Sequence, residues 1–365
     1  MTRATLVLAT GATALAMLAE ACSPTAASYG DGGVDSAPDA PDAPDAPDAP
    51  AEDGTDPDPP GKRDWNQAPA ILEMEAVADL WIVGDVHGDY ARLAALLDAA
   101  GLAAPATEPA AARWEAGAAT LVFVGDLINK GKDGLAVIAC VRALAASAEA
   151  AGGRVVVLMG NHEANFLAYP GGQMAQDFAT ELRAAGLDPR LVARGEAGPG
   201  AWLRALPIAL RIGDFFVIHA GNTKGRTLED LRKLVEQGVD AAGFAAGILS
   251  APDSILETPL QPHPWWEIPG YDGETILARW ATALGAKRFV QGHDPGEVTF
   301  SDGKKRKDGE MFQRFGRVFL VDVGMSSAIN ESRGAVLHAR LDGAGKTTVT
   351  AVHADGTVTP LWSGR

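Results

Sequence analysis

Cysteine is scarce in this sequence, and the one apolar stretch near its N-terminus is short. The 365 residues include two cysteines, Cys22 and Cys140, which excludes a disulfide-rich scaffold. Cys140 lies in an apolar run, where a small buried thiol on a helix is the expected structure. The stretch Ala4–Ala19 is too short and too rich in alanine for a transmembrane helix.

Clustered positive charge is also lacking. The chain carries a net charge of −16, but Met1–Gly61 holds eleven acidic residues against Arg3 alone, so the remainder is only mildly acidic. This balance argues against a nucleic-acid partner, because phosphate backbones require clustered Lys and Arg. The one basic cluster, Lys304–Lys307, has Asp and Gly on both sides and is interpreted as a solvated loop.

The N-terminus has the form of a secretory signal. A basic start is followed by the apolar stretch and by A-E-A before Cys22. L-A-E-A-C also resembles a bacterial lipoprotein signal, in which the cysteine becomes the lipidated first residue. It departs from that pattern at Ala19, since the usual leucine stands one position too early, as Leu18. We expect an exported protein, periplasmic or anchored in the outer membrane, that touches a membrane only through a lipid on Cys22.

A proline-rich and aspartate-rich segment follows the signal. P-D-A is repeated across Pro38–Pro50, where proline fixes φ and the aspartates repel one another. Such a segment cannot bury apolar surface and predicts a disordered tether. The sequence therefore divides into a signal peptide (residues 1–22), a linker (23–64) and one globular domain (65–365), which we expect to be a monomer.

Three apolar runs predict buried parallel strands. They are Leu80–Val86, Thr120–Gly125 and Arg154–Gly160, and each ends in a polar cluster. Amphipathic helical runs separate them at Ala91–Ala100 and Gly134–Ala151. This β-α-β-α-β order implies parallel strands with right-handed crossovers, whose ligands bind beyond the carboxyl ends of the strands.

The second half repeats this pattern. Phe215–Ile218 ends in H-A-G, Arg288–Val290 ends in Q-G-H-D-P, and Arg317–Val323 is a further strand. The tail Arg333–Trp362 alternates like antiparallel strands, with a turn at Ala354–Gly356. The predicted fold class is α/β, a four-layer sandwich of two mixed sheets flanked by helices.

The strand ends supply carboxylate, imidazole and amide groups, which are ligands suited to Mn, Fe or Zn. The D-x-H spacing places the side chains of Asp85 and His87 on the same face of one strand end. The Asp126 carboxylate can bridge two metal ions. Paired ions about 3.5–4 Å apart generate a hydroxide nucleophile and neutralise phosphoryl charge. Glycines before the ligands permit close backbone approach. The candidate residues are Asp85, His87, Asp126, Asn161, His162, His219 and His293.

A single G-D-x-H-G motif would be weak evidence, but turn chemistry does not explain five such clusters in fixed order. The series G-D-x-H-G, G-D, G-N-H-E, H-A-G, G-H resembles the calcineurin-like metallophosphoesterases, within them the phosphoprotein phosphatase branch. G-D-V-H-G-D-Y and L-M-G-N-H-E-A-N are most similar to the bacterial Shewanella-like phosphatases. The resemblance covers Leu80–Ser327.

The resemblance implies two divalent metal ions, with Mn favoured and Fe or Zn as alternatives. Three residues would hold the first ion and four the second, with one carboxylate shared between them. The first set is Asp85, His87 and Asp126; the second is Asp126, Asn161, His219 and His293. Asn161 and His219 would also contact the substrate phosphate. His162 would protonate the leaving-group oxygen, and Glu163 is expected to support the turn.

The sequence departs from the family pattern at the substrate-binding residues. The usual G-D-x-V-D-R-G reads G-D-L-I-N-K-G, with Asn129 and Lys130 in place of Asp and Arg. We expect Asn129 to accept a hydrogen bond from His162 without supplying negative charge. Lys130 would bind the phosphate as a point charge, without the two-pronged geometry of arginine.

A second phosphate-binding arginine is expected between the H-A-G and G-H motifs. The corresponding stretch, His263–Glu267, contains none. Arg226 and Arg279 are possible substitutes, although each is typical of a surface helix. His263, beside Trp265 and Trp266, is a candidate to line a substrate cleft.

The resemblance implies a dinuclear-metal-dependent phosphomonoesterase that uses a metal-bridging hydroxide, with a phosphorylated protein or a small phosphoester as substrate. Asp126, Asn129 and His162 would form the catalytic set. Two alternatives stay open. One is hydrolysis of nucleotides or diadenosine polyphosphates. The other is a catalytically weakened metal-binding surface protein, which the changes at Asn129 and Lys130 motivate.

Overall fold

The computed structural model describes residues 63–104 and 106–365. The predicted signal peptide, the lipid attachment at Cys22 and the linker up to residue 62 lie outside these residues and stay predictions. The folded part includes two residues of the predicted linker, because the Arg63 guanidinium donates to the carbonyls of Arg204 and Leu206 at 2.9 Å. Within the described part of the chain, no helix is both long enough and apolar enough to cross a membrane.

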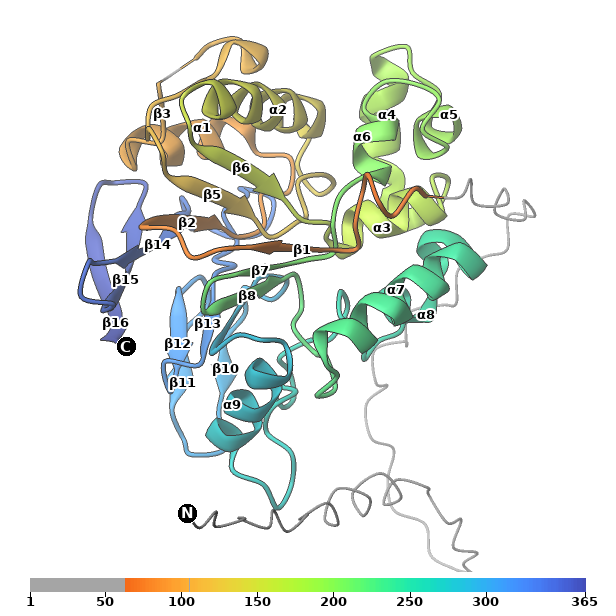
Figure 1. Ribbon diagram of the computed structural model, residues 1–365. Coiled ribbons are helices and arrows are strands. Elements are labelled where there is room, and N and C mark those ends of the chain that lie inside the picture. The colour runs from red at the N-terminus through yellow and green to blue at the C-terminus, as the bar shows by residue number, and fades with distance from the viewer. Residues whose placement is uncertain (1–62, 105) are drawn as a thin grey trace, which may run out of the picture. The chain divides into compact units, whose positions relative to one another are not determined.

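Two six-stranded mixed sheets form the centre of the domain (Figure 1). In the first, β2, β5 and β6 are parallel and the three C-terminal strands are antiparallel. Its order is β16 (Val358–Gly364), β15 (Thr347–His353), β14 (Ala335–Leu341), β2 (Asp79–Val83), β5 (Thr120–Phe123), β6 (Arg154–Val157). The order in the second is β1 (Ile71–Met74), β7 (Ala209–Ile212), β8 (Phe215–Ile218), β9 (Arg288–Gln291), β13 (Val318–Leu320), β12 (Phe312–Arg314).

Alternate side chains of the strands face different layers. Leu80 and Ile82 of β2 belong to an apolar cluster that also contains Val217 of β8 and Phe319 of β13, so this cluster lies between the sheets. The alternating Trp81 and Val83 face a second cluster, which contains the buried residues of the helices. Period-two burial on both faces gives the predicted four-layer sandwich, which is confirmed.

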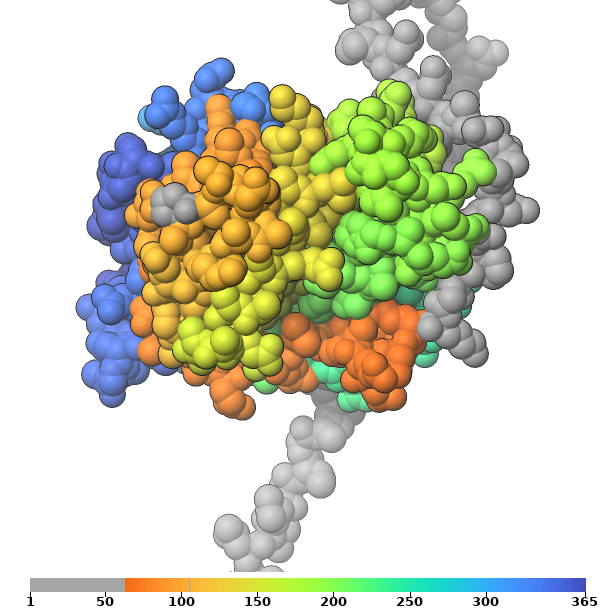
Figure 2. Space-filling model, turned by 90° about the horizontal axis from the view of Figure 1, so that it is seen from above, coloured from red at the N-terminus to blue at the C-terminus, as the bar shows by residue number. Residues whose placement is uncertain are grey.

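Helices cover the outer faces. α1 (Tyr90–Ala99) and α2 (Gly134–Ala150) lie over the first sheet, where α2 packs on β6, and α9 (Gly273–Ala283) packs on β9 of the second (Figure 1). Figure 2 shows the α1–α2 layer, orange to yellow, beside a green group of shorter helices. That group is α3 (Asn161–Ala168), α4 (Gln176–Ala184), α5 (Pro189–Ala193) and α6 (Gly200–Arg204). The remaining helices are α7 (Leu228–Ala242), α8 (Gly247–Ser250), η1 (Pro109–Ala111), η2 (Gln173–Ala175) and η3 (Gly243–Ala245).

The predicted elements are present, but four strands end earlier than expected, one of them β13, which stops at Leu320 rather than at Val323. β2, β5 and β6 stop at Val83, Phe123 and Val157, and the apolar residues that follow form loops. At Gly84 a Cβ atom would lie 2.4 Å from the Val321 carbonyl oxygen, so only glycine permits this approach. The two-residue ribbons β3 (Ala103–Ala104) with β4 (Arg113–Trp114), and β10 (Val298–Thr299) with β11 (Lys305–Arg306), were not predicted.

One member of the basic cluster is buried, which corrects the interpretation of Lys304–Lys307 as a solvated loop. Arg306 is fully buried, whereas Lys304, Lys305 and Lys307 are exposed. Its guanidinium donates to the carbonyls of Glu310 (2.8 Å), Asp294 (2.5 Å) and Asp322. Arg306 therefore joins the β11 hairpin to the loops that follow β9 and β13. Charge patterning alone did not separate this arginine from its lysine neighbours.

We predict that Arg306→Met destabilises the fold by roughly 3 kcal/mol or more, because it strands buried carbonyl groups that each cost about 1–3 kcal/mol when unpaired. Lys304→Met is the matched control and should change the unfolding free energy by less than about 0.5 kcal/mol. Urea unfolding of the two variants measures the difference. Equal urea midpoints in the two variants would show that water hydrogen-bonds to these carbonyl groups when the guanidinium is removed.

Candidate metal centre

The strand ends bring all the predicted ligands to one place. The loop after β2 carries Asp85 and His87, and the loop after β5 carries Asp126. Asn161 and His162 begin α3, His219 follows β8 and His293 follows β9. Backbone bonds lock the loops together: the His87 amide donates to the Asp126 carbonyl (2.8 Å) and the Gly292 amide donates to the His219 carbonyl (2.8 Å). Six of these seven residues are buried and His293 is half-buried.

The backbone of this region is strained. Seven non-glycine residues in the described part of the chain have positive φ, and five of them belong to this region. The five are His87, Asp126, Asn129, Lys130 and His293. Each such conformation costs of order 1–3 kcal/mol and persists only where surrounding contacts fix it. Gly292 makes room for the ligands, since a Cβ atom there would lie 2.3 Å from Asp85 Oδ1.

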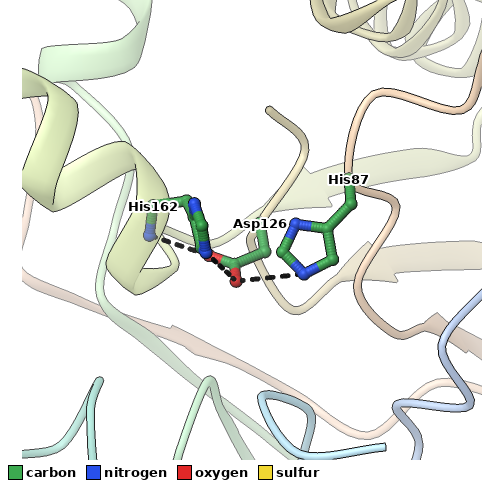
Figure 3. A group of neighbouring side chains, drawn as sticks. All are labelled: His87, Asp126 and His162. Carbon is green, nitrogen blue, oxygen red and sulfur yellow. Dashed lines mark hydrogen bonds and ion pairs between the residues drawn. The ribbon is translucent and has the colours of Figure 1, made fainter. Parts of the chain in front are cut away.

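Asp126 lies at the centre of the group. Its Oδ2 atom is 3.5 Å from His219 Nε2 and 3.6 Å from His87 Nε2. Figure 3 shows His87 and His162 approaching this carboxylate from opposite sides. Burial raises the pKa of Asp126, but the neighbouring histidines, which carry positive charge at the low pH where Asp126 titrates, outweigh it and hold the pKa below its usual range. The Asp126 carboxylate thus lies between the two predicted ligand sets.

Hydrogen bonds to main-chain carbonyls define which ring nitrogens carry protons. His219 Nδ1 lies 3.2 Å from the Val124 carbonyl, His87 Nδ1 lies 3.4 Å from that of Ile128, and His293 Nε2 lies 3.2 Å from that of Glu257. A carbonyl only accepts, so each of these nitrogens must donate. In the neutral rings, the opposite nitrogens therefore hold lone pairs that point into the site.

Four acceptor atoms converge in the second ligand set with no hydrogen between them. His219 Nε2 lies 3.0 Å from Asn161 Oδ1, 3.2 Å from His293 Nδ1 and 3.5 Å from Asp126 Oδ2. Burial lowers the pKa of His219, and burial with the neighbouring His219 lowers that of His293 to about 4, so both rings are neutral at neutral pH. Lone pairs this close repel unless a cation lies between them. Nitrogen and oxygen donors of this kind fit a divalent transition-metal ion.

The first ligand set has the same character. His87 Nε2 lies 3.6 Å from Asp126 Oδ2 and 3.9 Å from Asp85 Oδ2. Burial lowers the pKa of His87 to about 3, so this ring is also a neutral donor. Burial raises the pKa of Asp85, and the nearby Asp322 and Asp126 raise it further. A divalent ion between these carboxylates would remove that repulsion, so the residues present fit a pair of ions.

His162 differs from the three ligand histidines. The Asn129 Oδ1 atom accepts from the Phe178 amide at 3.0 Å, so Asn129 Nδ2 is the atom that faces His162 Nδ1 at 3.2 Å. Asn129 therefore donates to His162, and the prediction that it accepts is wrong: the Phe178 amide occupies its only acceptor. The proton of neutral His162 then lies on Nε2, 4.0 Å from Asp126 Oδ2. A ring nitrogen that carries a hydrogen has no lone pair for a metal, so Nε2 is no ligand in this tautomer. Proton donation from Nε2 requires the imidazolium form of the ring.

Two glutamates support the ligands. Glu163, as predicted, supports the turn: it accepts from the amides of Asp126 and Leu127 at 2.8 Å and from that of Gly160 at 2.9 Å. Glu257 was not predicted as part of the site. Its Oε2 atom accepts from Asn161 Nδ2 at 3.1 Å. It stands in I-L-E-T-P, away from any motif, so only the fold reveals it.

The residues predicted to bind the substrate, and their neighbours, differ in how exposed they are. Lys130 is exposed, and its charge acts on the pKa values of Asp85 and His87. Trp265 and Trp266, the neighbours of His263, are core residues, and the Trp265 indole is stacked on that of Trp280. The apolar pair fills the space under α9. His263 itself is exposed.

Neither substitute arginine is a buried ligand of the centre. Arg226 donates to the Thr223 carbonyl at 3.2 Å, and Arg279 is exposed on α9. Arg279 has the surface-helix position expected for it, whereas the expectation is wrong for Arg226, which is half-buried in the loop before α7. The charge of Lys130, in contrast, lowers the pKa values of the ligand residues Asp85, His87 and His219.

We predict that Asn129→Asp moves the alkaline limb of the pH–rate profile to higher pH. A general acid works in its protonated form, so activity is lost as pH rises through its pKa. Burial lowers the pKa of His162, with partial compensation from Asp126. The Asn129 NH₂ group, which donates to His162 Nδ1, also disfavours protonation of that nitrogen. A carboxylate there would accept that proton and raise the pKa of His162 by about one unit or more.

The measurement is the initial rate of an aryl phosphate hydrolysis between pH 5 and pH 10 at saturating metal. Superimposed profiles of the wild type and Asn129→Asp would contradict this role for His162. Metal content, measured in parallel, separates a change in proton transfer from a change in metal loading.

A family model and solved structures match the chain. The model described as calcineurin-like phosphoesterase matches residues 78–297, which include every candidate ligand. A crystal structure of a cold-active protein-tyrosine phosphatase from a Shewanella species superposes with a TM-score of 0.59 at 21% identity, covering 80% of this chain and 82% of that one. At this identity the likeness concerns the fold.

Curated relatives of two kinds match shorter stretches. A symmetrical bis(5'-nucleosyl)-tetraphosphatase from Janthinobacterium sp. is 32% identical over 190 residues, 50% of this chain and 60% of that protein. Shewanella-like protein phosphatase 2 of Arabidopsis thaliana is 33% identical over 81 residues, 22% of this chain and 19% of that protein. The chain thus spans less than two thirds of either relative.

Proposed function

The chain belongs to the calcineurin-like phosphoesterase family, and we propose that it is a two-metal phosphomonoesterase. One observation carries the proposal. Unprotonated ligand atoms converge around Asp126 Oδ2, and the protonated Nε2 of His162 lies 4.0 Å from the same oxygen. A metal pair and a proton donor beside it are the groups that hydrolysis of a phosphate ester requires.

Each residue has a distinct part in this proposal. When bound, the metal ions, Mn in preference to Fe or Zn, would activate water and neutralise charge on the phosphoryl group. Asp126 would hold both ions, with Asp85 and His87 on one side and Asn161, His219 and His293 on the other. In its imidazolium form, His162 would donate the Nε2 proton to the departing oxygen. Lys130 would attract the phosphate as a point charge.

The surroundings of Lys130 favour an ester with an aromatic leaving group. The Lys130 amide donates to Asp177 Oδ2 at 3.0 Å, which ties it to the start of α4. The segment just before α4 exposes two large apolar side chains, Tyr169 (48% exposed) and Met174 (41% exposed). Such side chains suit the ring of a phosphotyrosine. A nucleobase could use the same contact, so a nucleotide polyphosphate is the second candidate substrate.

We predict Mn-dependent hydrolysis of para-nitrophenyl phosphate by the full-length protein. His162→Ala should lower kcat by about 10²- to 10⁴-fold, the usual contribution of a general acid, while metal content stays unchanged. Asp126→Asn should lose both metal and activity. His353→Ala, a matched change in β15 where the ring contacts Thr359, should keep wild-type activity.

Turnover that is absent with Mn, Fe and Zn alike would overturn the proposal and favour a metal-binding surface protein. The same assay with a phosphotyrosine peptide and with diadenosine tetraphosphate compares the two substrate candidates. A higher kcat/KM for diadenosine tetraphosphate than for the phosphotyrosine peptide would favour a nucleotide polyphosphate hydrolase over a phosphomonoesterase.

We predict that Lys130→Met lowers kcat/KM about 10- to 100-fold, since it removes a phosphate contact worth some 1.5–3 kcal/mol. Lys130→Arg should retain activity or raise it, because a guanidinium can bind two phosphate oxygens at once. Lys132→Met, a charge change two residues away, is the control. Equal kcat/KM in Lys130→Met and the wild type would show that this lysine does not reach the substrate.

A further inference from the structure

We propose that Glu257 is a positioning residue that orients two ligands of the second metal set, Asn161 and His293. The inference rests on the metal centre of the proposed function. Glu257 contacts one ligand through its side chain and the other through its main chain. Its Oε2 atom accepts from Asn161 Nδ2 at 3.1 Å, and its carbonyl oxygen accepts from His293 Nε2 at 3.2 Å.

The side-chain contact decides which end of the Asn161 amide faces the metal. Because Nδ2 donates to Glu257, Oδ1 must point the other way, where it lies 3.0 Å from His219 Nε2. Without that acceptor the amide could turn by 180° and present its NH₂ group to the ion. An NH₂ group has no lone pair for a metal, so the turned amide would cost the second ion one ligand.

The main-chain contact decides which nitrogen of His293 is free. The Glu257 carbonyl takes the Nε2 proton, so Nδ1 keeps its lone pair and lies 3.2 Å from His219 Nε2. Bonds of this kind from an outer partner fix the tautomer and the ring orientation of ligand histidines. A side-chain substitution at Glu257 leaves this carbonyl in place. The two contributions can therefore be separated by experiment.

The segment that carries Glu257 is held against the loops of both histidine ligands. The Ala220 amide, next to His219, donates to the Ile255 carbonyl at 3.1 Å. The Leu260 amide donates to Oδ2 of Asp294, next to His293, at 3.0 Å. Ser254 Oγ accepts from the Glu257 amide at 3.2 Å and completes the turn. Glu257 is thus anchored well enough to transmit an orientation.

Calorimetric titration of the metal-stripped, full-length protein with Mn tests the proposal. The wild type should bind two ions. Glu257→Ala should bind one of them 10- to 100-fold more weakly, the usual effect of losing an outer partner, and the other with unchanged affinity. Glu257→Gln should stay within about threefold of the wild type, because the Gln Oε1 atom still accepts from Asn161. Asp253→Ala, an exposed carboxylate four residues away, controls for the lost charge.

The outcomes separate this proposal from the proposed function. Equal affinities in Glu257→Ala and the wild type would overturn the positioning role and leave the hydrolase assignment standing. Equal losses in Glu257→Gln and Glu257→Ala would also overturn it, since the carboxylate would then act through charge or direct ligation. No Mn binding by the wild type would overturn the metal centre itself. Thermal unfolding without metal should match in all variants, which shows that the fold is unchanged.

Discussion

The carboxylate of Asp126 is the constraint on which the rest of the site depends. Its Oδ2 atom approaches three histidine rings, and its Oδ1 atom accepts from the His162 amide at 3.0 Å. A buried anion surrounded by neutral imidazoles is stable only with positive charge close by. The lone pairs of the ligand atoms that converge around Asp126 also require a cation between them. The chemistry of the centre therefore begins with one carboxylate that the fold cannot satisfy alone.

The fold holds Asp126 in place by joining two sheets at their carboxyl ends. The apolar layer between the sheets fixes their separation, so that the loops after β5 and β8 meet. Glu163 then accepts from the amides on either side of the junction, those of Asp126 and Gly160. Gly160 has no Cβ because one would lie 2.1 Å from Asp126 Oδ1. Backbone strain at Asp126 and His87 is tolerated because these bonds leave the loops no alternative.

Much of this could be predicted from sequence. Short apolar runs that end in Asp, Asn or His define both the strands and the ligands, since parallel strands bring their carboxyl ends together. Arg306, Trp265 and Glu257 could not be placed in this way. Each lies in a segment whose local pattern is typical of surface loops, and its environment includes residues outside that segment. Burial of an isolated arginine, or contact of an isolated glutamate with a ligand, has no periodic signature.

The direction of the bond between Asn129 and His162 shows a second limit of sequence reasoning. Residue type allows asparagine to donate or to accept, and the outcome depends on the Phe178 amide at the start of α4. The Phe178 amide donates to Asn129 Oδ1, so the Asn129 NH₂ group faces His162 Nδ1. The neutral His162 ring therefore carries its hydrogen on Nε2. The same α4 segment binds the Lys130 amide through Asp177. The α4 segment thus orients Asn129 and Lys130, which lie in the same loop after β5 as the metal ligand Asp126. Metal binding and proton transfer are therefore coupled through shared elements, since Asn161 and His162 are consecutive residues at the start of α3.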